Sequence, residues 1–145
     1  MTQITRITGS RLISRGIVLV VLTTAVAWTY WPATAFGFLN WDDQAAIVRN
    51  PSLDYRAATW AFTTTYMEHY QPLSWLVWAS IKARFGLDAA AFHAANISAH
   101  AVCVMLVWGV SRRLFSRIAP EVPGSWHDGA ALTAALLYGL HPLRV

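Results

Sequence analysis

Two adjacent carboxylates, Asp42 and Asp43, are the residues of this sequence best suited to chemistry. They directly follow a long apolar stretch, and only 7 of the 145 residues are acidic. Charge beside lipid is costly unless it is used or solvated. An aspartate acts as a general base when it is held within hydrogen-bond reach of the hydroxyl whose proton it takes. Three interpretations stay open: a solvated loop pair, half of a metal site, or a general base at a membrane-surface active site.

In extended backbone, neighbouring side chains point in opposite directions. We therefore expect one aspartate to do the chemistry and the other to cap or orient the chain. The spacings typical of zinc sites are absent from the sequence, and its single cysteine, Cys103, lies in an apolar run. We expect no cofactor and no metal site, although two carboxylates alone leave dependence on a divalent metal open. A Gly-rich phosphate loop is also absent, which argues against a nucleotide substrate.

Several further polar residues could contact the phosphate of a membrane-borne donor. A donor phosphate needs cations or hydrogen-bond donors, and the candidates for donor binding are His69, Lys82, Arg84, His93, His141 and Arg144. For Lys82 and Arg84 the alternative is that a long side chain simply extends its charge to water at a membrane surface.

A polar stripe is formed by His93, Asn96 and His100, which lie at i, i+3 and i+7 on one face of a predicted helix. On a membrane helix, such a stripe must face protein or a wet cavity, because lipid cannot satisfy it. Asn96 and His100 fit hydrogen bonding between helices as well as a functional role. His93 is closer to the predicted outer surface and fits the lining of a site better.

The composition indicates an integral membrane protein. The chain is 56% hydrophobic and 12% charged, whereas soluble domains are about 25% charged. The net charge is +4 and the pI is about 9.7. The arginines lie beside apolar runs, as orientation signals do, so we expect no nucleic-acid partner.

The apolar pattern predicts an all-α, multi-spanning helical membrane protein with about three transmembrane helices and a large outer loop that carries a surface helix. In chain order we expect a cytoplasmic N-terminus at 1–16, transmembrane helix 1 at 17–39 and an outer loop at 40–91 with a juxtamembrane helix at 73–85. Transmembrane helix 2 follows at 92–111, then a cytoplasmic connector at 112–128 and a truncated transmembrane helix 3 at 129–145.

Arginines set the expected topology. Three of them precede the first span and place the N-terminus in the cytoplasm of a multi-pass protein of the cell (inner) membrane. A cleaved signal peptide is the alternative. Residues 73–85 reach only about 20 Å as a helix, so we expect this helix to lie on the membrane surface. If it spanned instead, Arg112, Arg113 and Arg117 would fall outside. The expected topology brings Glu68 and His141 to the same outer face as the two aspartates.

Six motifs in this order resemble the N-terminal part of the transmembrane and tetratricopeptide-repeat (TPR) O-mannosyltransferases and their bacterial relatives, members of the glycosyltransferase C superfamily. The resemblance covers about residues 36 to 145. The motifs are Leu39-Asn-Trp-Asp-Asp, Arg49-Asn-Pro, His69-Tyr-Gln-Pro-Leu, Phe85-Gly, Phe92-His-Ala-Ala-Asn-Ile-Ser-Ala-His and Leu140-His-Pro-Leu-Arg-Val.

The resemblance implies transfer of a mannose-like sugar from a polyprenyl-phosphate carrier, a membrane lipid, to a hydroxyl of an acceptor protein (Ser/Thr) or glycan. It puts the paired acidic motif on Asp42 and Asp43, with the first as the base. It puts the histidine motifs on His69, His93, Asn96, His100 and His141. Gln71 departs from the family pattern, which more often has arginine there. Because the family continues with further spans and soluble repeats, we expect a fragment that is inactive alone.

A non-catalytic membrane interaction or scaffold subunit is the alternative function. Small residues on the second span suit close helix packing; they are Ala94, Ala95, Ser98 and Ala99. A transporter fragment fits less well, because the acidic pair lies at a predicted surface rather than at mid-membrane.

Overall fold

The computed structural model describes residues 2–55 and 57–142, with side chains described for 15–54 and 57–142. The chain is 78% helical, and the described part contains no strand beyond an isolated bridge between Tyr66 and His69. The prediction of an all-α chain is therefore confirmed. The helices form two compact units, Met1–Pro32 with Asn96–Val145 and Ala33–Ala95. Each unit is described by itself.

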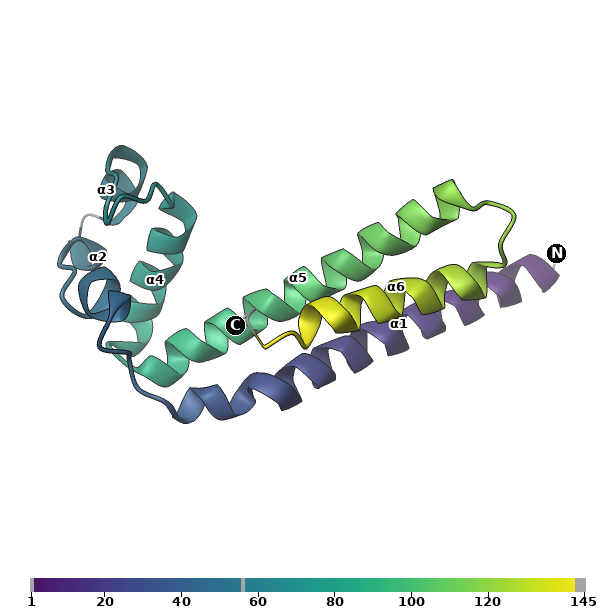
Figure 1. Ribbon diagram of the computed structural model, residues 1–145, viewed down its shortest axis with the longest axis horizontal. Coiled ribbons are helices and arrows are strands. Elements are labelled where there is room, and N and C mark those ends of the chain that lie inside the picture. Colours follow the sequence, from purple (N-terminus) through teal and green to yellow (C-terminus); the bar gives the residue numbers. More distant parts are fainter. Residues whose placement is uncertain (1, 56, 143–145) are drawn as a thin grey trace. The chain divides into compact units, whose positions relative to one another are not determined.

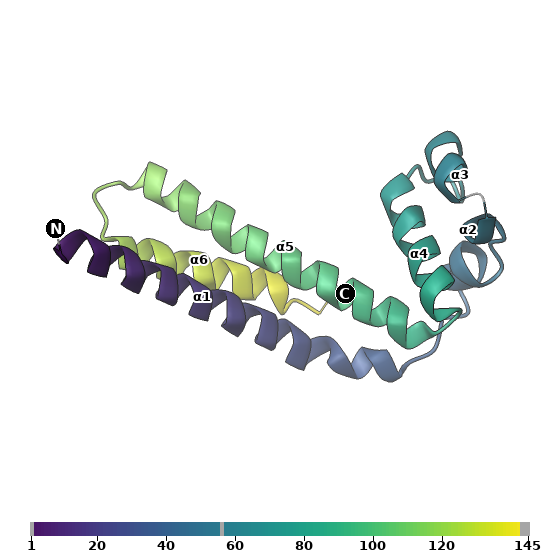
Figure 2. The ribbon, with the colours of Figure 1, turned by 180° about the vertical axis from the view of Figure 1, so that it is seen from behind.

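The first unit contains three long helices that lie side by side in both ribbon views (Figures 1 and 2). They are α1 (Thr2–Tyr30), the greater part of α5 (Ala89–Ile118) and α6 (Gly124–Gly139). Ala131 and Ala135 of α6 are fully buried, and these small side chains allow the neighbouring helices to approach closely. The buried core of this unit consists of Leu22, Val26, Ile97, Ala101, Val104, Trp108, Ala131 and Ala135.

Helix α1 ends earlier than the predicted span of 17–39. It stops at Tyr30 and continues as a short 3₁₀ helix, η1 (Trp31–Ala35), after which residues 36–39 have no regular structure. Pro32 explains this end, because proline lacks an N–H group and disfavours the α conformation of the residue before it. The predicted helix was too long because it followed hydropathy alone.

Two helical segments are long and apolar enough to cross a membrane. They are Arg15–Ala35, with mean hydropathy 1.5, and Ala89–Ile118, with mean hydropathy 1.6. Helix α6 has 16 residues, which corresponds to about 24 Å, against a hydrocarbon core of about 30 Å. The described residues therefore provide two candidate spans by length and composition, and the predicted third helix is shorter than a full crossing.

The connection between α5 and α6 is much shorter than the predicted 112–128. Helix α5 continues past its arginines to Ile118, and α6 begins at Gly124, with Pro123 as its N-cap. An ion pair between Arg112 and Asp128 joins the two helices. His127 is also buried, with its Nε2 2.9 Å from the carbonyl oxygen of Ala119. These contacts hold the polar residues in helices instead of a loop.

The second unit consists of short helices packed on α4 (Pro72–Phe85). They are η2 (Gln44–Val48, a π-helix), α2 (Ser52–Tyr55) and α3 (Ala57–Thr63). Trp75 of α4 is fully buried in their midst and contacts the rings of Trp60, Tyr66 and Trp78. Helix α4 agrees with the predicted 73–85, because Pro72 begins it and Gly86, with a positive φ of 67°, ends it.

Candidate functional site

The two aspartates have different surroundings in the second unit. Oδ2 of Asp43 accepts a hydrogen bond of 2.8 Å from the backbone N–H of Leu39, and the side chain is half-buried. Asp42 is exposed, and no hydrogen bond to its carboxylate is found within the described part of the chain. Asp43 therefore orients the turn that precedes η2, while the carboxylate of Asp42 faces solvent. Asp42 and Asp43 are helical rather than extended, so the extended-backbone argument does not apply to them, and the division of roles between them stays a prediction.

A π-helical turn directly follows the pair. The N–H of Arg49 donates to the carbonyl oxygen of Gln44 over 2.9 Å, which is the i to i+5 bond of a π-helix. Ala46 and Ile47 of this turn are buried in the core of the unit. Single π turns are rare and are found frequently at functional sites. Burial of this turn holds the acidic pair at the surface next to it.

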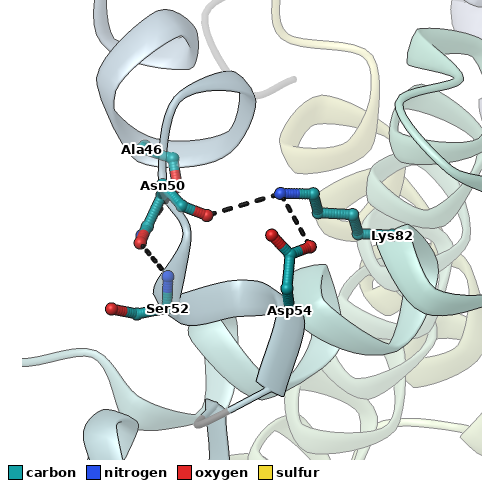
Figure 3. Close-up of polar contacts among 5 residues, drawn as sticks. All are labelled: Ala46, Asn50, Ser52, Asp54 and Lys82. Atoms are coloured by element: carbon teal, nitrogen blue, oxygen red, sulfur yellow. Dashed lines mark hydrogen bonds and ion pairs between the residues drawn. The ribbon is translucent and has the colours of Figure 1, made fainter.

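Asn50 and Lys82 connect this turn to α2 and α4 (Figure 3). Asn50 is 1% exposed, and its Nδ2 donates to the carbonyl oxygen of Ala46 over 3.2 Å. Its Oδ1 accepts from the N–H of Ser52 over 3.0 Å. The Nζ of Lys82 lies 3.4 Å from the backbone oxygen of Asn50 and 3.0 Å from Oδ1 of Asp54. Lys82, predicted to contact a donor phosphate, thus already has a carboxylate partner.

Arg84, on the same helix as Lys82, has no carboxylate partner among the described residues. Its side chain is exposed, and its guanidinium lies 5.7 Å from the centre of the Phe85 ring. It borders a hollow of about 370 Å³ on α4 and the beginning of α5. The hollow is mostly apolar and is lined by Leu76, Val77, Ser80, Ile81, Arg84, Phe85 and Ala95. A cation beside an apolar wall is an arrangement that suits an amphiphile with an anionic group.

His69 lies at the end of a tight turn in the same unit. Tyr66 and His69 exchange backbone hydrogen bonds of 3.1 and 3.0 Å. The two residues between them, Met67 and Glu68, have φ values of 51° and 63°, a conformation that is costly for side chains other than glycine. His69 and Glu68 are exposed. The hydroxyl of Tyr66 donates to the carbonyl oxygen of Ala45 over 3.1 Å, so the turn is attached to the segment after the acidic pair.

The three residues of the predicted polar stripe differ in environment. His93, in the second unit, is half-buried, and its Nε2 is enclosed without a hydrogen-bond partner among the described residues. Asn96 is exposed in the first unit. His100 is buried there, with its Nε2 2.9 Å from the carbonyl oxygen of Gly139 and its ring edge-on to Tyr30. His100 thus has the interhelical role that the sequence left open.

Of the last two predicted residues, only His141 lies in the described part of the chain. His141 is exposed, and its backbone oxygen accepts a hydrogen bond of 3.0 Å from the hydroxyl of Tyr30. His141 belongs to the first unit and the acidic pair to the second. Arg144 lies outside the described residues.

Sequence reasoning missed the importance of Asn50 and Asp54. In the sequence, Asn50 is part of the Arg49-Asn-Pro motif, and Asp54 belongs to none of the candidate groups. Asparagine before a bend is a weak signal of a side chain that bonds nearby backbone groups. Nothing in the local sequence indicates that Asn50 is buried or that Asp54 meets Lys82.

Comparisons with protein-family models, with curated proteins and with solved structures found no match. The resemblance to the O-mannosyltransferases therefore rests on the motifs and their order. Among the described residues, no group of three or more His, Cys, Asp or Glu side chains is placed to hold a metal ion.

Proposed function

We propose that this chain is part of a membrane glycosyltransferase that moves a mannose-like sugar from a polyprenyl-phosphate carrier to an acceptor hydroxyl. The observation that carries the proposal is the division of the acidic pair. Asp43 is bonded to the N–H of Leu39, while Asp42 is exposed. Both follow closely after Arg15–Ala35, a segment able to cross a membrane. An unengaged carboxylate that follows a candidate span by a few residues in the sequence is suited to take a proton at the membrane surface.

In the proposed reaction, the carboxylate of Asp42 accepts the proton of the acceptor hydroxyl. The hydroxyl oxygen forms a bond to the anomeric carbon of the sugar. The bond between that carbon and the phosphate oxygen breaks, and the polyprenyl phosphate leaves with the electron pair. Attack opposite to the leaving group inverts the anomeric centre. Asp43 holds the backbone in place, so that Asp42 keeps its position relative to the acceptor.

Arg84 is the cation that best supports contact with the carrier phosphate. Its side chain is exposed and borders the apolar hollow on α4, whereas Lys82 is paired with Asp54. In this proposal His69 and His93 are further donor-binding groups. Asp42, His69, Arg84 and His93 all belong to the second unit.

The proposal includes a topology in the cell (inner) membrane. The N-terminus is cytoplasmic, residues 36–88 lie outside with α4 on the membrane surface, and α6 forms a short third span. The candidate spans Arg15–Ala35 and Ala89–Ile118 support the first two crossings. An outer position of the acidic pair suits an acceptor and a lipid-linked donor that meet at that surface.

The test replaces single carboxylates in the gene at its own locus, so that the polypeptide is assayed at its natural length. Membranes receive polyprenyl-phosphate mannose with a radioactive sugar, and transfer to acceptor is counted. We expect Asp42→Asn to lower turnover by about 10²- to 10⁴-fold, the usual contribution of a general base. Asp43→Asn should cost less, because an amide oxygen can still accept from Leu39 N–H.

Glu121→Gln is the matched control, since it removes an exposed carboxylate from the first unit. It should leave transfer unchanged. Unchanged turnover in both Asp42→Asn and Asp43→Asn would show that the pair has no catalytic part.

A non-catalytic scaffold subunit is the second candidate. It is favoured by a hollow of about 670 Å³ on α1 and η1 and by exposed apolar side chains such as Val20 and Trp28. Such a surface suits a partner helix in a membrane. The same assay separates the two functions, because a scaffold has no transfer activity for Asp42→Asn to remove.

A further inference from the structure

We propose that Lys82 and Asn50 are positioning residues that connect α4 to the turn after the acidic pair, and that Lys82 is not a ligand of the donor phosphate. The catalytic consequence rests on the proposed function, whereas the structural part can be tested without it. The connection runs from Lys82 through Asn50 to Ala46, within the second unit (Figure 3).

The burial of Lys82 requires an anionic partner. Its side chain is 13% exposed, and Nζ lies 3.0 Å from Oδ1 of Asp54, which is 45% exposed. A largely buried ammonium group is costly without a paired charge and further hydrogen bonds. The backbone oxygen of Asn50 supplies the second contact at 3.4 Å. A ligand phosphate would have to compete with a carboxylate of this chain for the same ammonium.

Helical geometry separates the roles of Lys82 and Arg84. Residues two apart on an α-helix point in nearly opposite directions, because one turn takes about 3.6 residues. Lys82 accordingly faces α2, where Asp54 lies, while Arg84 is exposed at the hollow. The two cations therefore face different sides of α4, and of these two only Lys82 has a carboxylate partner among the described residues.

Asn50 links α4 to the turn that follows Asp42 and Asp43. Both ends of its buried amide are used, Nδ2 by the carbonyl of Ala46 in η2 and Oδ1 by the N–H of Ser52 in α2. Asp43 is the N-cap residue of η2 and is itself bonded to Leu39. Loss of Lys82 would thus loosen the Asn50 backbone first and then the turn that carries the pair.

Tyr66 supports the same segment from a second direction. Its hydroxyl donates to the carbonyl of Ala45, next to the carbonyl that Asn50 binds. Neighbouring carbonyls of η2 are therefore held by two separate side chains. This second contact should keep the unit folded when the Lys82 contacts are removed.

The first measurement is hydrogen–deuterium exchange of the full chain in lipid nanodiscs. In Lys82→Met, which keeps the length of the side chain but removes its charge, we expect amides of residues 39–50 to exchange about tenfold faster. Asp54→Asn, which removes the partner instead, should act in the same direction with a smaller effect. Arg84→Met, two residues away on α4, is the matched control and should leave this segment unchanged.

The second measurement is sugar transfer by membranes that carry the same variants. Lys82→Met should lower kcat and leave KM for the lipid-linked donor within about twofold, since a positioning residue does not bind substrate. A raised donor KM in Lys82→Met, or exchange of residues 39–50 equal to that of the unchanged chain, would overturn the inference. If the unchanged chain transfers no sugar, the proposed function fails, and the exchange experiment still decides the role of Lys82.

Discussion

At the scale of single residues, the contacts of His100 explain why this polar side chain is buried. Its ring lies between Tyr30 of α1 and Tyr138, and its Nε2 is 2.9 Å from the carbonyl oxygen of Gly139 in α6. A buried polar group of this kind is stable only with its partner. His100 therefore joins helices of the first unit.

Substitution of His100 by leucine should destabilise the first unit. It leaves the carbonyl of Gly139 without this partner and replaces a ring that contacts two tyrosines, a loss of about 1–2 kcal/mol. The free energy of unfolding in mixed micelles, followed by circular dichroism while the denaturing detergent is increased, measures this change.

Asn96→Leu is the matched control for that experiment. Asn96 is one turn away on α5 but exposed, so its replacement should change the unfolding free energy by less than about 0.5 kcal/mol. Equal destabilisation by the two variants would contradict the structural role of His100.

At the scale of elements, the close approach of α6 to α5 at Gly139 depends on the lack of a side chain at this residue. A Cβ atom built there would lie 2.8 Å from Cγ2 and 3.1 Å from Cγ1 of Val104. Val104 is buried and β-branched, so it has few other rotamers to adopt. The two helices would have to move apart to accommodate a methyl group.

Gly139→Ala should therefore lower the stability of the helix pair by about 1–3 kcal/mol, the usual cost of overpacking. Gly129→Ala provides the comparison within α6, because a Cβ atom at Gly129 meets nothing within 4 Å. Alanine there should be neutral or slightly stabilising, since it is a better helix former. Thermal unfolding of both variants in the same detergent is the measurement. A Gly139→Ala protein as stable as Gly129→Ala would show that α5 and α6 are not in close contact.

At the scale of the whole molecule, the proposed topology places residues 36–88 on one side of the membrane and residues 119–123 on the other. Arg113 and Arg117, exposed on the C-terminal part of α5 just before the short α5–α6 connection, carry the positive charge expected on the cytoplasmic side. Single cysteines in these two segments can report the side on which each lies.

Labelling of intact cells with a membrane-impermeant maleimide tests this arrangement in a Cys103→Ser background. A cysteine at Ala58, which is exposed on α3, should react from outside. A cysteine at Glu121, exposed beyond α5, should react only after the membrane is made permeable. Reaction of both cysteines from the same side would rule out a topology in which α5 crosses once between them.

Some features of this chain followed from sequence because they depend on neighbouring residues. Helix α4 was predicted almost to the residue, since Pro72 and Gly86 mark its ends. The apolar runs predicted α1 and α5, but hydropathy alone missed the effect of Pro32 on the end of α1 and the helical state of Arg112. Hydropathy reports burial or lipid contact along a segment and does not report where the backbone hydrogen bonds stop.

The partners of the polar side chains were decided by tertiary structure. Lys82 and Arg84 look equivalent in the sequence, yet contacts with residues about thirty positions earlier make Lys82 a paired charge and leave Arg84 exposed. The spacing of His93, Asn96 and His100 places them on one face of a helix, but their burial differs because different elements cover each position. Sequence spacing determines which residues share a face over one or two helical turns. Burial and pairing depend instead on which distant segments pack together.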